Sequence, residues 1–139
     1  MADSPETVMR NWFEQLWNQG NEEAIPQLFA ADGKAYGLAP NPICGPAEFL
    51  PLYRAFRQAF PDMHIDIERC VASGDMVAVH CHVKATHSGT GFGPVSDQPV
   101  DFWGFCMARV KDGQLVEGWN CFDFMTCYQQ IGLLPQLPV

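Results

Sequence analysis

The sequence predicts an α+β fold in which helices come first and a sheet of largely antiparallel strands follows. Up to about residue 60, apolar residues recur at intervals of three and four, which is the spacing of one helix face. After residue 62 apolar and polar residues alternate, and short turns that contain Gly separate the alternating stretches. Helices that precede a meander of strands pack on one face of its sheet. The length of 139 residues fits a single domain, residues 1–139.

Two helices are expected before residue 30. The first spans residues 4–19, because Ser4 can cap it, Pro5 suits its first turn and Gly20 ends it. Its apolar side carries several aromatic residues, for which packing in the core is the first interpretation. One or two of them could also line a pocket, because a helix over a sheet faces whatever the sheet encloses. A second, short helix is expected over residues 21–29.

A third helix follows an irregular segment. Residues 30–44 are rich in Gly and Pro and are expected to form a loop with one short strand near Tyr36. The third helix spans residues 45–60 and ends before Pro61. Its apolar stripe includes Tyr53, whose hydroxyl needs a partner if it is buried. Tyr53 is therefore either a core residue or a hydrogen-bond donor in a pocket.

Four strands and a short final helix are expected in the rest of the chain. The strands cover about residues 63–71, 76–84, 100–110 and 115–124, and the helix covers residues 128–134. The apolar side of the first three strands is expected in the core and carries Met63, Ile65, Ile67, Val71, Val77, Val79, Cys81, Val83, Val100, Phe102, Cys106, Ala108 and Val110.

Large apolar residues also fall on the other side of the third strand. If Phe102 and Cys106 face the core, Trp103, Phe105 and Met107 face outward. An exposed apolar patch of that kind usually marks a protein interface. We therefore expect a homodimer that forms through the outer face of the sheet.

The last strand carries the first candidate for catalysis. Counting by twos places Trp119 and Asp123 on one face and Asn120 on the other. A carboxylate between Phe122 and Phe124 is hard to explain as a solubility device. If Asp123 is buried, desolvation raises the pKa of its carboxyl group and makes it a proton carrier near neutral pH.

Composition and charge exclude several classes of function. The formal net charge is −8 with eight Lys and Arg in total, which argues against nucleic-acid binding. No apolar run approaches the length of a membrane span, and the first residues lack the basic and apolar regions of a signal peptide. A cytoplasmic location is therefore expected. The six cysteines include no C-x-x-C pair and are expected to be small buried hydrophobes rather than disulfides or zinc ligands.

The histidines are weaker candidates for a site. His80 and His82 share a strand face at a spacing that can chelate a metal, but they oppose the core side, which favours an outward position. His87 ends its strand on the core side, where it can donate to a ligand at a pocket mouth or face solvent. No nucleophile elbow is present, and no helix signal follows the glycine-rich stretch at residues 89–93. A metal site is therefore not expected.

Several local strings and their order along the chain carry a resemblance to a known family. They are EQLWN at 14–18, RAFRQAFPD at 54–62, GDMVAV at 74–79, ATHSG at 85–89, DGQLVEGW at 112–119 and QIGLLP at 130–135. In this order they resemble the SnoaL-like polyketide cyclases of the nuclear transport factor 2-like superfamily. The resemblance covers nearly the whole chain.

This resemblance implies a cone-shaped fold in which a curved antiparallel or mixed sheet wraps around the N-terminal helices and encloses a deep apolar pocket. It implies that the aspartate four residues after the last-strand Trp, here Asp123, acts as general acid/base in an intramolecular aldol condensation without metal, cofactor or covalent intermediate. The expected ligand is a planar, apolar carbonyl compound. The expected substrate-binding residues are Phe13, Trp17, Tyr53, His87, Phe102, Trp119 and Asn120.

Three functions stay open at this point. The first is a cyclase- or isomerase-like enzyme that uses Asp123. The second is a non-catalytic small-molecule-binding or accessory protein, in which Asp123 only fixes the ligand or the structure. The third is epoxide hydrolysis, which needs a pair of carboxylates bridged by arginine; Arg69 is the arginine that the core-facing strand positions offer, so this function is the least supported.

Overall fold

The computed structural model of this chain describes residues 2–136. Its helices are α1 (Pro5–Asn11), η1 (Trp12–Asn18), α2 (Ala24–Leu28), α3 (Gly45–Ala59) and α4 (Phe124–Gln130). Its strands are β1 (Phe29–Tyr36), β2 (Ile43–Cys44), β3 (His64–Ser73), β4 (Met76–Thr86), β5 (Pro99–Lys111) and β6 (Gln114–Phe122).

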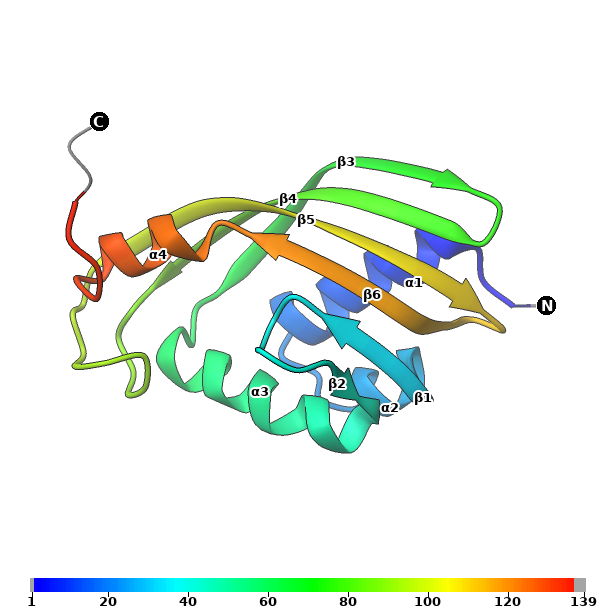
Figure 1. Ribbon diagram of the computed structural model, residues 1–139, viewed down its shortest axis with the longest axis horizontal. Helices are drawn as coiled ribbons and strands as arrows, with labels where there is room; N and C mark the ends of the chain where they lie inside the picture. Colours follow the sequence, from blue (N-terminus) through cyan, green and yellow to red (C-terminus); the bar gives the residue numbers. More distant parts are fainter. Residues whose placement is uncertain (1, 137–139) are drawn as a thin grey trace.

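The strands form one mixed, curved sheet. Six strands pair in the order β2-β1-β6-β5-β4-β3, in which β1 and β6 run parallel and the other pairs run antiparallel. The sheet bends over α1, α2 and α3, which lie on its concave side, while α4 lies at the end where β6 stops (Figure 1). This arrangement confirms the predicted α+β fold. It also leaves the convex side of β3 to β6 without a covering helix among residues 2–136.

The first predicted helix is present but changes its winding in the middle. Ser4 caps α1 as expected, since its hydroxyl oxygen accepts from the Thr7 backbone N–H at 3.2 Å. From residue 12 the chain continues as a π-helix, η1, whose four buried side chains include Phe13 and Trp17. π-helical turns are rare in proteins, but those that occur are often found at functional sites. The wider turn changes the directions in which side chains point. Here the turn directs aromatic rings toward the sheet.

Two predicted boundaries were wrong for identifiable reasons. Residues 29–36 form the strand β1, with a shift of its register against β6 between Phe29 and Lys34. Their Asp, Gly and Lys have low strand propensity, but pairing with β6 and β2 overrides local preference. The last helix begins at Phe124 rather than at residue 128, because the Asp123 side chain caps it.

A bulge in β3 corrects one predicted core residue. Ile67 pairs with Cys81 and Arg69 pairs with His80, so the register shifts by one residue between them. After this bulge Cys70 instead of Val71 lies on the core side, and the Val71 side chain is 70% exposed. Simple alternation therefore predicted the wrong face for Val71.

The two faces of β5 differ as predicted. Its even-numbered residues from Val100 to Val110 are buried. Trp103, Phe105 and Met107 are 39%, 59% and 44% exposed on the other face. The outward orientation of these three residues is confirmed, whereas the homodimer expected from it stays a prediction.

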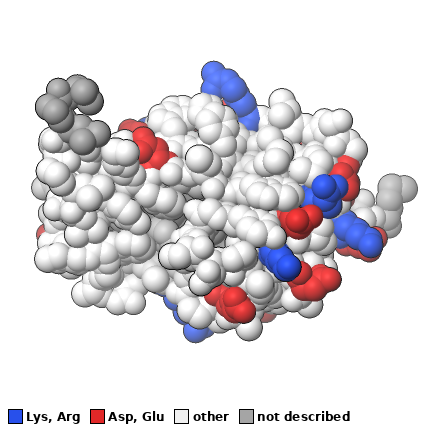
Figure 2. Space-filling view, in the orientation of Figure 1, with Lys and Arg blue, Asp and Glu red and all other residues white. Residues whose placement is uncertain are grey.

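The charged side chains are unevenly distributed. On the face shown in Figure 2 they gather at the end of the molecule where the N-terminus lies, and the opposite half is mostly uncharged. No helix among the described residues is long and apolar enough to cross a membrane.

Asn18 fastens η1 to the edge strand β3. Its side-chain oxygen accepts from the Ile65 N–H at 2.7 Å, and its amide nitrogen donates to the Ile65 carbonyl at 2.9 Å. We predict that Asn18→Ala lowers the free energy of unfolding by about 1–3 kcal/mol, because both backbone groups of Ile65 lose their partner. Urea unfolding measures this change. Gln19→Ala, which removes an exposed side chain one residue away, is the control. Equal effects of the two substitutions would contradict the anchoring role of Asn18.

Candidate functional site

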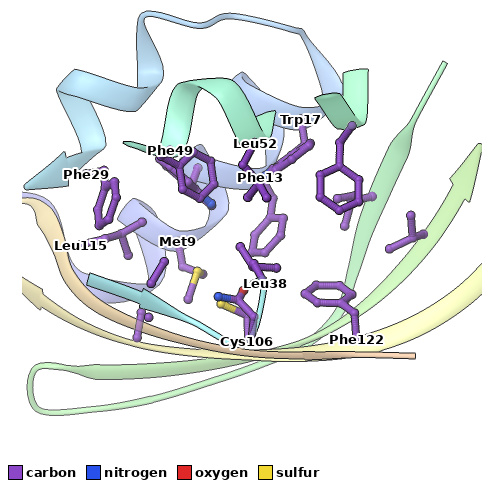
Figure 3. A pocket seen from close by; sticks show the side chains of 18 of the residues that line it. Met9, Phe13, Trp17, Phe29, Leu38, Phe49, Leu52, Cys106, Leu115 and Phe122 are labelled. Atoms are coloured by element: carbon purple, nitrogen blue, oxygen red, sulfur yellow. The ribbon is translucent and has the colours of Figure 1, made fainter. Parts of the chain in front are cut away.

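An apolar cavity lies between the helices and the concave face of the sheet. Figure 3 shows the helical residues on one side of it and the sheet residues on the other. The volume open to the centre of a water-sized sphere is about 80 Å³. A single water needs about 10–15 Å³ by this measure, so the cavity is much larger than a water site.

Every layer of the fold contributes to the cavity wall. The helices provide large apolar side chains, namely Met9, Trp12, Phe13, Trp17, Phe49, Leu52, Phe56 and Phe124. The strands and the β1–β2 connection provide Phe29, Lys34, Ala35, Leu38, Ile65, Val83, Phe102, Cys106, Ala108, Leu115, Gly118, Asn120 and Phe122, and Met63 precedes β3. Apolar walls with few polar groups are typical of small-molecule sites.

Two glycines on the sheet shape this space. An added Cβ at Gly118 would meet no atom within 4 Å, so the absence of a side chain there leaves the cavity open. An added Cβ at Gly104 would lie 2.1 Å from the Phe122 ring, which pairs with Gly104 across the two strands. Gly104 therefore lets the Phe122 ring lie flat against β5 instead of filling the cavity.

Asn120 places an amide group in the apolar wall. Its side-chain nitrogen donates to the Tyr36 carbonyl at 3.0 Å, which holds the amide between β6 and the end of β1. Within residues 2–136 this is the hydrogen bond that the side chain makes. The amide oxygen and the second N–H are therefore available to a ligand. Gly37, at φ +89°, permits this approach, because an added Cβ would lie 1.9 Å from the Asn120 carbonyl oxygen.

The other chemically active groups at the cavity are unsuited to acid/base or nucleophilic chemistry. Burial raises the pKa of the Cys106 thiol to about 12, so it is a neutral thiol at pH 7. Lys34 contributes to the cavity margin, but it is exposed and alternates with the buried Ala35. Its side chain therefore lies on the same strand face as Tyr36, away from the cavity.

Four of the predicted substrate-binding residues line the cavity together. Phe13 and Trp17 come from η1, Phe102 from β5 and Asn120 from β6. Their contact with a substrate stays a prediction. The alternation that placed Asn120 opposite to Asp123 is observed, and Asn120 is the one of the two that faces the cavity.

Three other predicted substrate-binding residues lie elsewhere. Tyr53 is a core residue, since its hydroxyl donates to the Leu16 carbonyl at 2.8 Å and burial raises its pKa. Trp119 lies on the convex side, where its ring stacks on Tyr36 with 6.1 Å between ring centroids. Neither residue lines the cavity.

His87 is the third. It is fully buried, and its Nε2 donates to the Gly91 carbonyl at 2.8 Å, while its Nδ1 lies 2.9 Å from the Ser96 hydroxyl. These bonds fasten the 88–98 loop to the end of β4. His87 is therefore a structural residue behind the cavity wall rather than a donor at its mouth.

Asp123 is not buried, contrary to the expectation for a desolvated carboxylate. It follows the last residue of β6 and is exposed. Its carboxylate accepts from the Thr126 backbone N–H at 3.0 Å and from the Thr126 hydroxyl at 2.6 Å. Its neighbours Phe122 and Phe124 line the cavity, whereas Asp123 does not. In this structure Asp123 is the N-cap of α4.

Sequence reasoning missed most of the helical wall and the opening at Gly118. The apolar stripe of the third helix already contained Phe49, Leu52 and Phe56, but a stripe does not tell a core contact from a cavity contact. A glycine inside a strand rich in large residues was a usable signal at Gly118, since such a glycine marks close approach or empty space.

The described residues hold no cluster of three His, Cys, Asp or Glu side chains that could bind a metal ion. His80 and His82 lie on the convex face, as their position in the alternation indicated. His80 contacts Arg69 at 3.2 Å, and His82 contacts Asp101 at 2.5 Å.

Comparison with known proteins supports one family. The family model for SnoaL-like polyketide cyclases matches residues 7–131. A SnoaL-like polyketide cyclase candidate from Jannaschia sp. CCS1 superimposes with a TM-score of 0.85 at 19% identity, covering 94% of this chain and 93% of its own, which shows a shared fold. No functionally curated protein sequence matches this chain.

Two Streptomyces structures are more similar in sequence. IdmH of Streptomyces antibioticus, a proposed polyketide cyclase, is 27% identical with a TM-score of 0.81, covering 94% of this chain and 99% of its own. AclR of Streptomyces galilaeus, a proposed hydroxylase, is 25% identical with a TM-score of 0.84, covering 96% of this chain and 84% of its own. The shared scaffold therefore does not by itself specify the reaction.

The capping role of Asp123 predicts how two substitutions affect stability. Asp123→Ala removes both hydrogen bonds to Thr126 and should lower the free energy of unfolding by about 1 kcal/mol. Asp123→Asn should change it little, because asparagine caps helices as well as aspartate does. Denaturant unfolding of both variants measures the difference. An equal loss in both would show that the negative charge, and not the cap, stabilises α4.

Proposed function

Because this chain belongs to the SnoaL-like polyketide cyclase family, we propose that its cavity binds a planar, polyketide-like carbonyl compound and promotes ring closure by intramolecular aldol condensation without a cofactor. The observation that carries this proposal is the cavity itself, in which apolar aromatic walls surround the Asn120 amide. An apolar wall suits a flat, conjugated ligand, and the amide suits one of its carbonyl or hydroxyl groups.

The proposed chemistry needs little from the protein besides geometry. A methylene group between two carbonyls is acidic, so hydroxide from solvent removes its proton and leaves an enolate and water. The enolate carbon then attacks a second carbonyl of the same molecule, a carbon–carbon bond forms as the carbonyl π bond breaks, and the resulting alkoxide takes a proton from water and regenerates hydroxide. Binding to the cavity holds the two reacting carbons together, so binding energy offsets part of the entropic cost of ring closure. The curved sheet and the aromatic helix side chains would enforce that folded shape.

Asn120 has a defined role in this proposal. Its amide N–H can donate to the carbonyl oxygen on which negative charge develops, and the surrounding apolar wall strengthens that hydrogen bond. The bond to the Tyr36 carbonyl fixes the amide before the ligand arrives. A preorganised donor costs no reorientation at the moment of reaction.

Proton transfer by Asp123 is the less supported part of the proposal. The carboxylate is exposed and is held by Thr126, so it cannot reach the cavity in this arrangement. One observation favours it nonetheless, since Phe122 and Phe124 on either side of Asp123 line the cavity. We propose that folding of the substrate supplies most of the rate enhancement and that Asp123 mainly positions α4.

Binding without turnover is the second candidate function. It is favoured by the absence of carboxylate side chains from the cavity wall among residues 2–136. In that case the same cavity would hold a related ligand, and Asn120 would fix its orientation.

The cavity proposal predicts the effect of filling the space at Gly118. Gly118→Leu should weaken binding of a planar quinone such as anthraquinone at least tenfold, because the new side chain occupies the open space. Fluorescence quenching of the cavity tryptophans measures the affinity. Val116→Leu, which enlarges a residue of the same strand outside the cavity, should bind as the wild type does. Unchanged binding in Gly118→Leu would place the ligand elsewhere.

The catalytic proposal predicts different effects at two neighbouring positions. Asn120→Leu should reduce turnover of an aromatic compound with a β-diketone side chain about 100-fold, as expected for loss of a donor to a developing oxyanion. Asp123→Asn keeps the helix cap and should retain turnover within about threefold of the wild type. Product formation is followed by chromatography. A large loss of turnover in Asp123→Asn with intact binding would assign proton transfer to Asp123. Binding in both variants without turnover in the wild type would support the binding function.

A further inference from the structure

Three small residues lie side by side in the sheet wall of the cavity. Ala35 pairs with Gly118 across β1 and β6, and Gly118 pairs with Ala108 across β6 and β5. All three line the cavity. Because neighbouring strands are about 4.8 Å apart, this row is about 9.6 Å wide. We call these three residues the small-residue bay.

Larger side chains border the bay to its left and right in the sheet. Ile43 pairs with Ala35 across β1 and β2, and Val77 pairs with Ala108 across β4 and β5. Both Ile43 and Val77 are buried. The bay therefore spans three strands and is bounded by a branched side chain on either side.

The bay is closed toward the start of β6. The next residue of β6 that pairs in this direction is Leu115, which pairs with Phe29 on β1 and with Val110 on β5, and all three are buried. Val116 is an extra residue in β6 at this point, so Leu115 and Gly118 both face the cavity although they are three residues apart. Leu115 therefore forms an end wall directly beside the bay.

A pair of polar side chains borders the bay on its fourth side. Asn120 and Cys106 pair across β6 and β5, two residues beyond Gly118 and Ala108, which is about 6.8 Å along the strands. Both line the cavity. Cys106 is 6% exposed, and within residues 2–136 its thiol has no hydrogen-bond partner. Buried polar groups usually have a partner, so a thiol that faces open space points to a ligand.

The other end of the cavity is more open. Leu52, Phe122 and Phe124 line it there and are half-buried. Figure 3 shows Phe122 at one end of the cavity and Leu115 at the other. The cavity therefore has a long axis that follows β6, from the open end at Phe122 to the end wall at Leu115.

We propose that the cavity takes a linear fused-ring ligand end first, with an unsubstituted end ring over Gly118 against Leu115 and a carbonyl group of the second ring at Asn120. This inference rests on the proposed small-molecule function of the cavity and adds the shape and the orientation of the ligand. The end ring fits the bay because none of its three floor residues has more than a methyl group. The polar pair lies behind this ring, where the first oxygen of the ligand arrives.

Met9 is suited to cover the end ring from the helical side. It is fully buried, lines the cavity and lies between Leu115 and Cys106 in Figure 3. A thioether makes favourable contacts with an aromatic ring. The ring then has the sheet on one side and Met9 on the other, which suits a flat ligand.

The end wall makes the site selective for one kind of ring. A methyl group on the leading edge of the end ring meets the buried Leu115 side chain, which has no space to move into. A methyl group at the trailing end points toward the open end at Phe122 and is tolerated. One methylene group in a well-shaped apolar pocket changes affinity about 10–200-fold, so the difference is measurable.

Three quinones test this orientation in the wild type by quenching of tryptophan fluorescence. Anthraquinone and 2-methylanthraquinone should bind within about threefold of each other, because the second compound can enter with its unsubstituted end first. 2,6-Dimethylanthraquinone, which carries a methyl group at both ends, should bind at least about tenfold more weakly. Equal binding of the two methylated compounds would overturn the proposal.

Shortening the end wall should remove this selection. Leu115→Ala should bind 2,6-dimethylanthraquinone within about threefold of anthraquinone, because the truncated side chain leaves room for the methyl group. Leu16→Ala is the matched control, since Leu16 is fully buried but does not line the cavity, and it should keep the tenfold difference. An unchanged selection in Leu115→Ala, or an equal loss of selection in both variants, would refute the assigned end wall.

Two further measurements separate this proposal from folding defects and from the function itself. Circular dichroism checks that both variants are folded, and Leu115→Val is a milder change that should bind 2,6-dimethylanthraquinone at least about threefold more tightly than the wild type does. Failure of the wild type to bind any of the three quinones would contradict the proposed small-molecule function as well. Binding of all three without selection would contradict only the orientation.

Discussion

The alternation of side chains along β5 and β6 is the constraint on which both surfaces of this protein depend. Successive residues of a strand point to opposite faces, so each strand must satisfy two environments with one sequence. On β5 the buried residues close the cavity, and the residues between them form the convex patch around Phe105. A shift of one residue in either strand would exchange the two sets and destroy both surfaces.

The same constraint explains why Asn120 and not Asp123 faces the cavity. From Glu117 to Phe122 the register of β6 against β5 is unbroken, so residues three apart face opposite ways. The bulge that could have changed this lies earlier in β6, where Val116 is the extra residue between Leu115, which pairs with Val110, and Glu117, which pairs with Arg109. A carboxylate directly after the strand end is then free to turn back onto the first turn of α4. Its capping bonds to Thr126 are a local consequence of the strand ending at Phe122.

The spacing of apolar residues and the positions of Gly and Pro were sufficient to predict the helices α1 and α3, the four long strands and the two faces of β5. They were insufficient where strand pairing decides whether a segment forms a strand or which face a residue occupies. The strand β1 has a poor local sequence and exists because β6 offers a parallel edge. The bulge near Ile67 is invisible in a sequence that keeps alternating, which is why Val71 was assigned to the wrong face. For the site, the aromatic residues on η1 were recognisable candidates. Whether they line a cavity, however, depends on how the helices pack against the sheet.

Open space at Gly118 has a cost that the rest of the fold must offset. A valine or threonine there would have higher strand propensity, and its side chain would add buried apolar area. The sheet instead carries glycine at Gly118, where an added Cβ would meet no atom within 4 Å, and at Gly104, where the Phe122 ring packs into the space that a side chain would occupy. Sequences that only maximise stability fill such gaps, because each buried methylene contributes about 0.8 kcal/mol. An open, apolar cavity beside a fixed amide is therefore more readily explained by a ligand than by the requirements of folding.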